Sequence, residues 1–285
     1  MMLKILVTGT TGNVGQEVVR LLLLQNCRVC AAVRNPTSAK QILGNHVECI
    51  SFDFTNPGTF VEAFQEVNQL FLVRPPALAN VRQQIAPALN AAKLAGVEHI
   101  VFLSLQGAER NSFVPHSKIE RYINQLGIPA TFLRCGFFMQ NLNTTHKEDI
   151  KTRGELLMPA GNGKTSFIDV RDIAAVAVKT LIEDGHQSRA YTLTGKEALT
   201  YYEVADIFTS VLGKPIRYNP SLLKFVRQMR SSGLSMGFIL VMIAIYTTAR
   251  LGLAGEVTSD TEQLLNRSPI TIREYVEDYK QFWLC

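Results

Sequence analysis

Cysteine is scarce in this chain, and neither sign of charge dominates. The 285 residues include five cysteines and one tryptophan, with 29 Lys and Arg against 24 Asp and Glu, a formal charge of +5. A small, odd number of cysteines provides no disulfide framework. The cationic residues are scattered rather than clustered, which favours a small anionic ligand and predicts no nucleic-acid partner. A hydrophobic content of 47% excludes disordered, collagen-like and coiled-coil chains.

Long hydrophobic runs are also missing. The most apolar segment, Met236–Tyr246, falls well short of the roughly 20 residues that cross a bilayer, and Arg230 and Arg250 flank it. We expect this segment to form a helix that packs over a pocket or at a subunit contact. The sequence thus allows a homodimer and predicts no membrane partner. The N-terminus enters a strand pattern directly, without a cleavable signal. The sequence therefore predicts a cytoplasmic protein with reduced thiols.

Cys27 and Cys30 form a C-x-x-C pair, but their surroundings do not favour chemistry. The run CRVCAAVR reads as a buried strand. Residues three apart on a strand point to opposite faces. We therefore expect neither a redox pair nor a metal site.

Strand and helix patterns alternate through the first half of the chain. The expected strands cover residues 4–8, 28–33, 47–52, 69–73, 99–104 and 130–134. The expected helices cover residues 15–24, 57–66, 81–95 and 115–125. Strands that are apolar at consecutive positions are covered on both faces, and regular strand–helix alternation indicates a doubly wound parallel sheet.

A glycine-rich loop follows the first expected strand. Residues 8–15 read TGTTGNVG and lead into the first expected helix. Glycines at this spacing let the backbone turn sharply and approach a pyrophosphate, while the helix start offers free N–H groups. A glycine-rich turn alone could give the same letters, but its position between strand and helix favours a Rossmann-type dinucleotide site.

The residue after the second expected strand distinguishes the two pyridine dinucleotides. NAD sites usually carry an acidic residue there, whereas this chain has Arg34 followed by Asn35. An arginine can pair with a 2′-phosphate and stack on adenine. The sequence favours NADP(H), with NAD(H) still possible; alternatively, Arg34 is merely solvated at the strand end.

The pattern loosens after about residue 150. The expected later elements are strands over residues 166–170 and 191–193 and helices over residues 172–183, 202–212 and 271–283. These elements are too discontinuous to predict an independent core. We therefore expect an α/β chain with a Rossmann domain over residues 1–150 and a smaller, mainly helical substrate-binding lobe over residues 151–285, intertwined with it.

Together these motifs resemble the NmrA-like family of atypical short-chain dehydrogenase/reductases. The resemblance covers nearly the whole chain and is carried by TGTTGNVG, VRNP after the second strand, DF at residues 53–54, HSKIE at 116–120, TFLRCGFFMQN at 131–141 and SDTEQLL-x-RSPIT from residue 259. The family includes NAD(P)H-dependent quinone oxidoreductases, a triphenylmethane-dye reductase, and a nitrogen-metabolism regulator that senses the dinucleotide.

The resemblance implies a set of cofactor-binding residues. The glycine loop would hold the pyrophosphate, Arg34 the 2′-phosphate, and the later positions the adenine, ribose and nicotinamide in turn. The implied residues are Gly9, Thr11, Gly12, Asn13, Val14, Arg34, Asp53, Phe54, Val73, Arg74, Ser104, Gln106, Gly136, Phe137 and Phe138. The same positions follow from topology, because ligands of such folds bind outside the carboxyl ends of the strands. Phe137 and Phe138 could instead fill the core.

The Tyr-x-x-x-Lys pair of ordinary superfamily members is missing, since none of the eight tyrosines has a lysine four residues later. That pair supplies a proton donor. The catalytic candidates that remain are His116, Lys118 and Glu120. We expect Glu120, one helical turn on, to orient His116, which would relay a proton or bind substrate. Lys118 would bind cofactor hydroxyls; alternatively, His116 bonds to the backbone and Lys118 is solvated.

Two functions stay open at this point. The first is a cytoplasmic reductase that transfers a hydride from NADPH to a quinone or similar conjugated acceptor, which requires positioning more than a tyrosine acid. The second is a sensor that binds NADP(H) and acts through a protein partner. The apolar segment and the aromatic turn suggest a cavity for a small-molecule acceptor and favour the enzyme. The missing tyrosine weakens a third reading, a nucleotide-sugar epimerase or dehydratase.

Overall fold

In a computed structural model, which describes residues 2–284, the chain folds into two compact units. Unit 1 comprises residues 1–135 and 170–193, and unit 2 comprises residues 136–169 and 194–285. The chain therefore passes between the units three times, whereas the sequence predicted a single boundary near residue 150.

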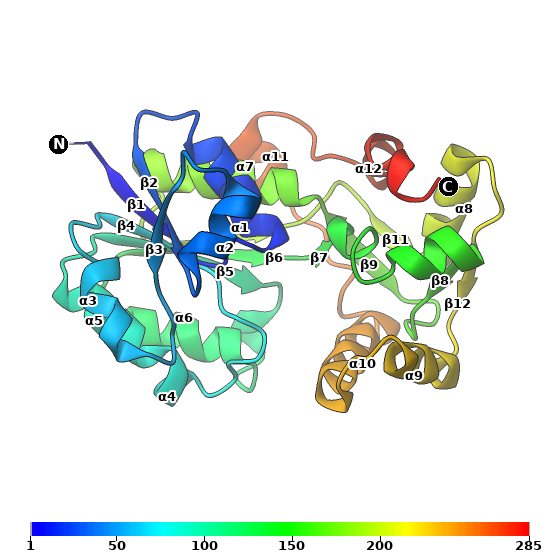
Figure 1. Cartoon of the computed structure of the whole chain (residues 1–285). Coiled ribbons are helices and arrows are strands. Elements are labelled where there is room, and N and C mark those ends of the chain that lie inside the picture. The colour runs from blue at the N-terminus through cyan, green and yellow to red at the C-terminus, as the bar shows by residue number, and fades with distance from the viewer. Residues whose placement is uncertain (1, 285) are drawn as a thin grey trace. The chain divides into compact units, whose positions relative to one another are not determined.

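A parallel sheet of seven strands forms the centre of unit 1 (Figure 1). In spatial order its strands are β10 (Arg189–Leu193), β6 (Ala130–Cys135), β5 (His99–Leu105), β4 (Gln69–Leu72), β1 (Lys4–Val7), β2 (Arg28–Val33) and β3 (Glu48–Ser51). The strands expected in the first half are present to within one residue at each end. The α/β prediction of a doubly wound parallel sheet is confirmed.

Helices cover both faces of this sheet (Figure 1). They are α1 (Asn13–Leu22), α2 (Pro36–Leu43), α3 (Phe60–Ala63), α4 (Val81–Gln84), α5 (Ala86–Leu94), α6 (Pro115–Leu126) and α7 (Val170–Ile182). On one face α1 packs against α7, and on the other α3, α5 and α6 bury a cluster that includes Phe102 of β5. The helix expected over residues 81–95 is two helices, and Pro87, which lacks an N–H group, lies in the first turn of the second.

The last strand and helix of unit 1 come from the half of the sequence assigned to the smaller lobe. Strand β10 pairs in parallel with β6, with Arg189 opposite Thr131 and Leu193 opposite Cys135. Helix α7 lies on the sheet beside α1. The sheet is therefore completed only by residues 170–193.

Unit 2 is built from short elements. Its strands are β7 (Phe137–Phe138), β8 (Glu155–Leu157), β9 (Lys164–Ile168), β11 (Ala198–Thr200) and β12 (Arg217–Asn219). Its helices are α8 (Tyr201–Leu212), α9 (Leu222–Ser231), α10 (Met236–Arg250), α11 (Asp260–Leu265) and α12 (Ile272–Asp278). The strands form two small sheets, β11-β9-β7 and β12-β8.

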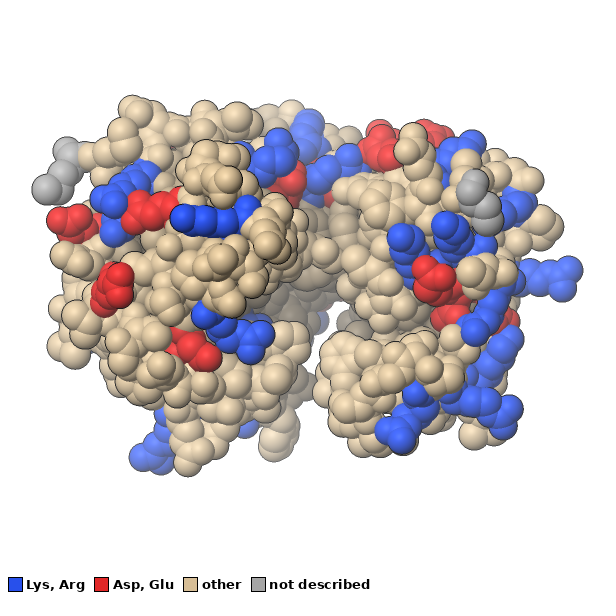
Figure 2. All heavy atoms as spheres, viewed as in Figure 1, with Lys and Arg blue, Asp and Glu red and all other residues tan. Residues whose placement is uncertain are grey.

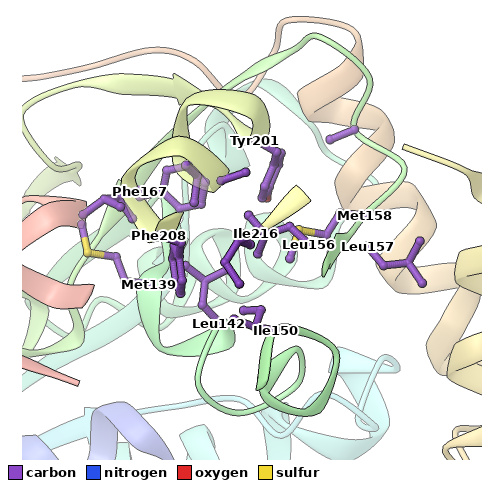
Figure 3. Packing of buried hydrophobic residues seen from close by; sticks show 14 of the residues in the cluster. Met139, Leu142, Ile150, Leu156, Leu157, Met158, Phe167, Tyr201, Phe208 and Ile216 are labelled. Atoms are coloured by element: carbon purple, nitrogen blue, oxygen red, sulfur yellow. The ribbon is translucent and has the colours of Figure 1, made fainter. Parts of the chain in front are cut away.

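Unit 2 has a hydrophobic core of its own, although the sequence predicted that its elements were too discontinuous to form one. Figure 3 shows Phe167 of β9 near Tyr201 and Phe208 of α8, all three in one buried cluster. Tyr275 and Trp283 near the C-terminus are completely buried in the same cluster. Large side chains on short elements bury enough apolar surface to form a core without any long periodic pattern.

The apolar segment of the sequence forms helix α10. Its inner face contributes Ile239, Met242 and Tyr246 to the core of unit 2, while Leu240 and Val241 are more than half exposed. Figure 2 shows a largely uncharged surface over this helix. Within residues 2–284 no helix has the length and hydrophobicity to span a bilayer. That α10 packs over a pocket or at a subunit contact stays a prediction.

Candidate functional site

The topology of unit 1 gathers the predicted cofactor residues at one edge of its sheet. Because all seven strands are parallel, their carboxyl ends lie at a common edge. Gly9 follows β1, Arg34 follows β2, Asp53 follows β3, Arg74 follows β4, and Ser104 lies near the end of β5. Ligands of doubly wound sheets bind along this edge, where the strand order reverses.

The glycine loop packs its backbone closer than side chains would allow. Gly9 has a φ of +66°, and a Cβ atom added there would lie 2.8 Å from the Cβ of Val73. Its carbonyl accepts a hydrogen bond of 3.0 Å from the N–H of Gly12. A Cβ atom on Gly15, in the first turn of α1, would meet this carbonyl oxygen at 2.2 Å. The loop therefore depends on glycine at positions 9 and 15.

Within residues 2–284, the N-terminus of α1 has no side-chain cap. Gly12 is the N-cap residue, no side chain accepts a hydrogen bond from the first turn, and the first turn contains no acidic residue. The leading N–H groups and the positive end of the helix dipole favour an anion. Thr11, Gly12 and Asn13 are exposed, whereas the Val14 side chain is buried. A pyrophosphate fits this loop, with backbone N–H groups as its ligands.

Arg34 is exposed at the end of β2, while the neighbouring Asn35 caps α2 by accepting a hydrogen bond from the N–H of Ser38. Hydrogen bonds from Thr55 and the positive charge of Arg34 lower the pKa of Asp53. The charge of Arg34 therefore acts on the end of β3. That Arg34 binds an adenosine 2′-phosphate stays a prediction.

Phe54 belongs mainly to the core of unit 1. Its side chain is 7% exposed, and its ring packs edge-on against Phe52 with the ring centroids 4.8 Å apart. The part of this ring that could flank an adenine is small. That Asp53 and Phe54 flank the adenine stays a prediction.

The end of β4 is tied to β1 by a side chain. Thr8 Oγ1 accepts a hydrogen bond of 2.7 Å from the N–H of Val73. The next residue, Arg74, donates from Nη1 to the carbonyl groups of Pro75, Pro76 and Leu78 at 2.9–3.1 Å. Arg74 thereby holds its own loop at the sheet edge.

His116 lies in the first turn of α6 and stacks on Phe102, with the ring centroids 5.9 Å apart. Burial, and then the positive charge of Arg74, lower the pKa of His116 to about 4. Its Nδ1 atom is buried and has no hydrogen-bond partner among the described residues, 2–284. The imidazole is therefore neutral at pH 7.

The expected contact between Glu120 and His116 is not formed within residues 2–284. Glu120 instead accepts hydrogen bonds from Ser104 Oγ at 2.6 Å and from Arg134 Nε and Nη2 at 3.2 and 2.7 Å. Spacing along one helix brought His116 and Glu120 onto neighbouring turns, but Glu120 faces the sheet, where a cation from β6 attracts it.

Arg134 is a residue of the candidate site that the sequence motif TFLRC contains but for which the sequence predicted no role. A charged residue inside a buried strand requires a partner of opposite charge, and this signal in TFLRC could have revealed the pair.

Lys118 points away from these groups. It is exposed and lines a surface hollow with Tyr122, Gln125 and residues 79–82. The solvated alternative fits this position, and a role on cofactor hydroxyls stays a prediction.

Gln106 and the aromatic turn extend from the ends of β5 and β6. The Gln106 N–H donates to the carbonyl of Cys135 at 2.9 Å, which joins the two strand ends. Gly136, Phe137 and Phe138 belong to unit 2, where Phe137 pairs with Phe167 across β7 and β9 and packs against it with ring centroids 5.7 Å apart. Their place beside a nicotinamide stays a prediction.

The cysteines of the C-x-x-C pair are free thiols. Burial, and then the charge of Glu48, raise the pKa of Cys30 to about 12, so that this thiol is protonated at neutral pH. Residues 2–284 hold no group of three or more side chains suited to bind a metal ion.

Known proteins share this sequence and this fold. Residues 1–276 match the NmrA-like family. NAD(P)H azoreductase of Xenophilus azovorans is 34% identical over 278 residues, which are 96% of each chain. Triphenylmethane reductase of Citrobacter sp., solved with NADP(H), superimposes with a TM-score of 0.85 at 27% identity, over 96% of this chain and 99% of that one. NADPH-dependent quinone oxidoreductase of Escherichia coli, solved with NADPH, superimposes with a TM-score of 0.86 at 26% identity. The superposition covers 97% of this chain and 99% of that one. The chain therefore belongs to the NmrA-like family, as its glycine loop and later motifs predicted.

Proposed function

We propose that this NAD(P)H-dependent reductase of the NmrA-like family transfers a hydride from NADPH to a quinone or a similar conjugated acceptor. The observation that carries the proposal is the uncapped start of α1 behind a glycine cradle that a Cβ atom would fill. This arrangement suits a pyrophosphate. Arg34, exposed at the end of the adjacent strand, supplies the cation that a 2′-phosphate requires.

The strand order supports an assignment of the two halves of the dinucleotide. Arg34 and Asp53 follow β2 and β3, on one side of the glycine loop. Arg74 follows β4 and Ser104 belongs to β5, on the other side. With the adenosine half at Arg34, the nicotinamide half extends over β4 and β5. When bound, the reduced nicotinamide supplies the hydride; the chain's own residues hold and orient it.

Conjugated acceptors suit a site that lacks the usual tyrosine proton donor. His116 is neutral at pH 7 and stacked on Phe102, and no tyrosine stands before a lysine at the required spacing. A hydride added to a quinone leaves an anion stable enough to take its proton from water, and a hydride added to a cationic dye leaves a neutral product that needs no proton. The relatives are named for azo, triphenylmethane and quinone reduction, and azo compounds, triphenylmethane dyes and quinones are all conjugated.

The test follows NADPH absorbance in the presence of a quinone, an azo dye, a triphenylmethane dye and, as the control, a saturated ketone. We expect oxidation with conjugated acceptors and none above background with the ketone. Calorimetry with NADPH accompanies the assay. Measurable NADPH binding without oxidation by any acceptor would favour the alternative, a dinucleotide sensor that acts through a protein partner. Absence of binding would contradict both.

A further inference from the structure

We infer that Glu120 and Arg134 fix the Ser104 hydroxyl as a hydrogen-bond acceptor, and that this hydroxyl binds the carboxamide N–H of the nicotinamide. Ser104 is then a cofactor-binding residue and Glu120 its positioning residue. The inference rests on the proposed function, because it requires a pyridine dinucleotide along the sheet edge.

The Ser104 hydroxyl has its single proton committed. Ser104 lies near the end of β5 and is 4% exposed, and its Oγ donates to Glu120 Oε1 at 2.6 Å. A hydroxyl carries one donor and two acceptor positions. Any further ligand of Ser104 Oγ must therefore donate to it.

Arg134 sets the direction of this hydrogen bond. It stands directly opposite Ser104 in the pairing of β5 with β6, and it donates to both carboxylate oxygens of Glu120. The Glu120 side chain is 7% exposed. Both carboxylate oxygens of Glu120 therefore face N–H donors of Arg134, and Glu120 accepts from the Ser104 hydroxyl instead of donating to it.

The strand order indicates which ligand group reaches this hydroxyl. Ser104 belongs to β5, two strands from the glycine loop on the side away from Arg34. The nicotinamide half of a dinucleotide extends to this side. The carboxamide is the hydrogen-bond donor of the nicotinamide ring, and it matches an oxygen that can only accept.

The test compares the binding of NADP⁺ with that of its 3-acetylpyridine analogue, in which a methyl group replaces the amide NH₂ and the carbonyl is kept. Calorimetry gives the ratio of the two dissociation constants for each variant. For the wild-type protein we expect NADP⁺ to bind about 3- to 10-fold more tightly, the value of one hydrogen bond. In Ser104→Ala the two ligands should bind equally.

Glu120→Gln keeps the shape of the side chain and reverses the polarity of Ser104. Because Arg134 requires an acceptor, the glutamine oxygen will face it and the glutamine NH₂ will donate to Ser104, which turns the serine proton toward the ligand. The preference for NADP⁺ should disappear, and the analogue should bind this variant more tightly than it binds the wild type. If Glu120 had a purely structural role, Glu120→Gln would weaken the binding of both ligands equally, and the ratio of their dissociation constants would not change.

Glu109→Gln is the matched control, because Glu109 contacts Arg134 from the other side at 3.4 Å. For Glu109→Gln, the ratio of the dissociation constants of NADP⁺ and its analogue should equal that of the wild type. If Glu120→Gln does not fold, as judged by circular dichroism, Ser104→Ala decides the question alone. An unchanged ratio in Ser104→Ala overturns the inference while leaving the proposed function intact; failure of the wild type to bind NADP⁺ or NADPH overturns both.

Discussion

The carbonyl oxygen of Gly9 occupies the place that a Cβ atom on Gly15 would require, with only 2.2 Å between them. In Gly15→Ala either the loop or the start of α1 must move. We expect a loss of about 1–3 kcal/mol in the free energy of unfolding, as for other overpacked sites. Dinucleotide binding should be lost as well, because the loop and the helix N-terminus form one cradle. Urea unfolding and calorimetry measure the two effects.

Gly12→Ala separates stability from binding. A Cβ atom there would lie an ordinary 3.4 Å from Gly9 O, and Gly12 has a φ of −94° that alanine adopts readily. We expect stability within about 0.5 kcal/mol of the wild type, but weaker dinucleotide binding, because the methyl group stands at the anion-binding end of α1. If Gly15→Ala lowers the free energy of unfolding no more than Gly12→Ala does, the loop is less closely packed than the structure indicates.

Arg34→Ala tests the choice between the two dinucleotides. Loss of a charge-assisted hydrogen bond to the 2′-phosphate should weaken NADPH binding about 10- to 100-fold. NADH lacks this phosphate, so its affinity should change little. Arg20→Ala is the control, because Arg20 lies on α1 and pairs with Glu17 at 2.6 Å. Equal losses for both dinucleotides would contradict the role assigned to Arg34.

Thr8→Val removes the acceptor of the Val73 N–H and keeps the shape of the side chain. The hydrogen bond is 2.7 Å long, and Thr8 is 1% exposed. A buried N–H without a partner costs about 1–3 kcal/mol, so the midpoint of urea unfolding should fall. Thr8→Ser retains the hydroxyl and should recover most of the stability. A variant Thr8→Val as stable as the wild type would mean that water replaces the lost acceptor.

His116→Phe tests the depressed pKa of this residue. Burial lowers the pKa to about 4 in the folded state, against about 6.5 in an unfolded chain. The unfolded state therefore binds more protons between these values, so this group's contribution to stability falls as the pH drops from about 6.5 to 4. Relative to the wild type, His116→Phe should gain about 1–2 kcal/mol at pH 5 compared with pH 7. If the difference in free energy of unfolding between His116→Phe and the wild type is the same at both pH values, His116 keeps an ordinary pKa.

The sheet and the glycine loop could be predicted because their signals are local. Runs such as ILV and LFLV are apolar at consecutive positions, and they end close to where the strands end. Gly9 and Gly12 precede α1 and Gly15 lies in its first turn, as the glycine spacing in the sequence indicated. The residues at the strand ends then follow, because a parallel sheet brings them to one edge.

The partners of buried polar groups could not be predicted in the same way. Spacing along α6 placed Glu120 near His116, whereas the pairing of β5 with β6 brings Ser104 and Arg134 together as the donors to this carboxylate. The core of unit 2 depends on residues as far apart as Met139 and Trp283. Such contacts between distant segments leave no periodic signal in the sequence.

The late arrival of β10 has a consequence for the order of folding during synthesis. When Cys135 leaves the ribosome, β6 is still an open edge of the sheet, and the helix that covers α1 has not been made. After 34 residues that belong to the other unit, α7 is complete at residue 182 and can cover α1, and β10 can pair with β6 once residue 193 has emerged. Nascent chains are thus exposed to edge-to-edge association during this interval. A gene fragment that stops near residue 150 would make that exposure permanent.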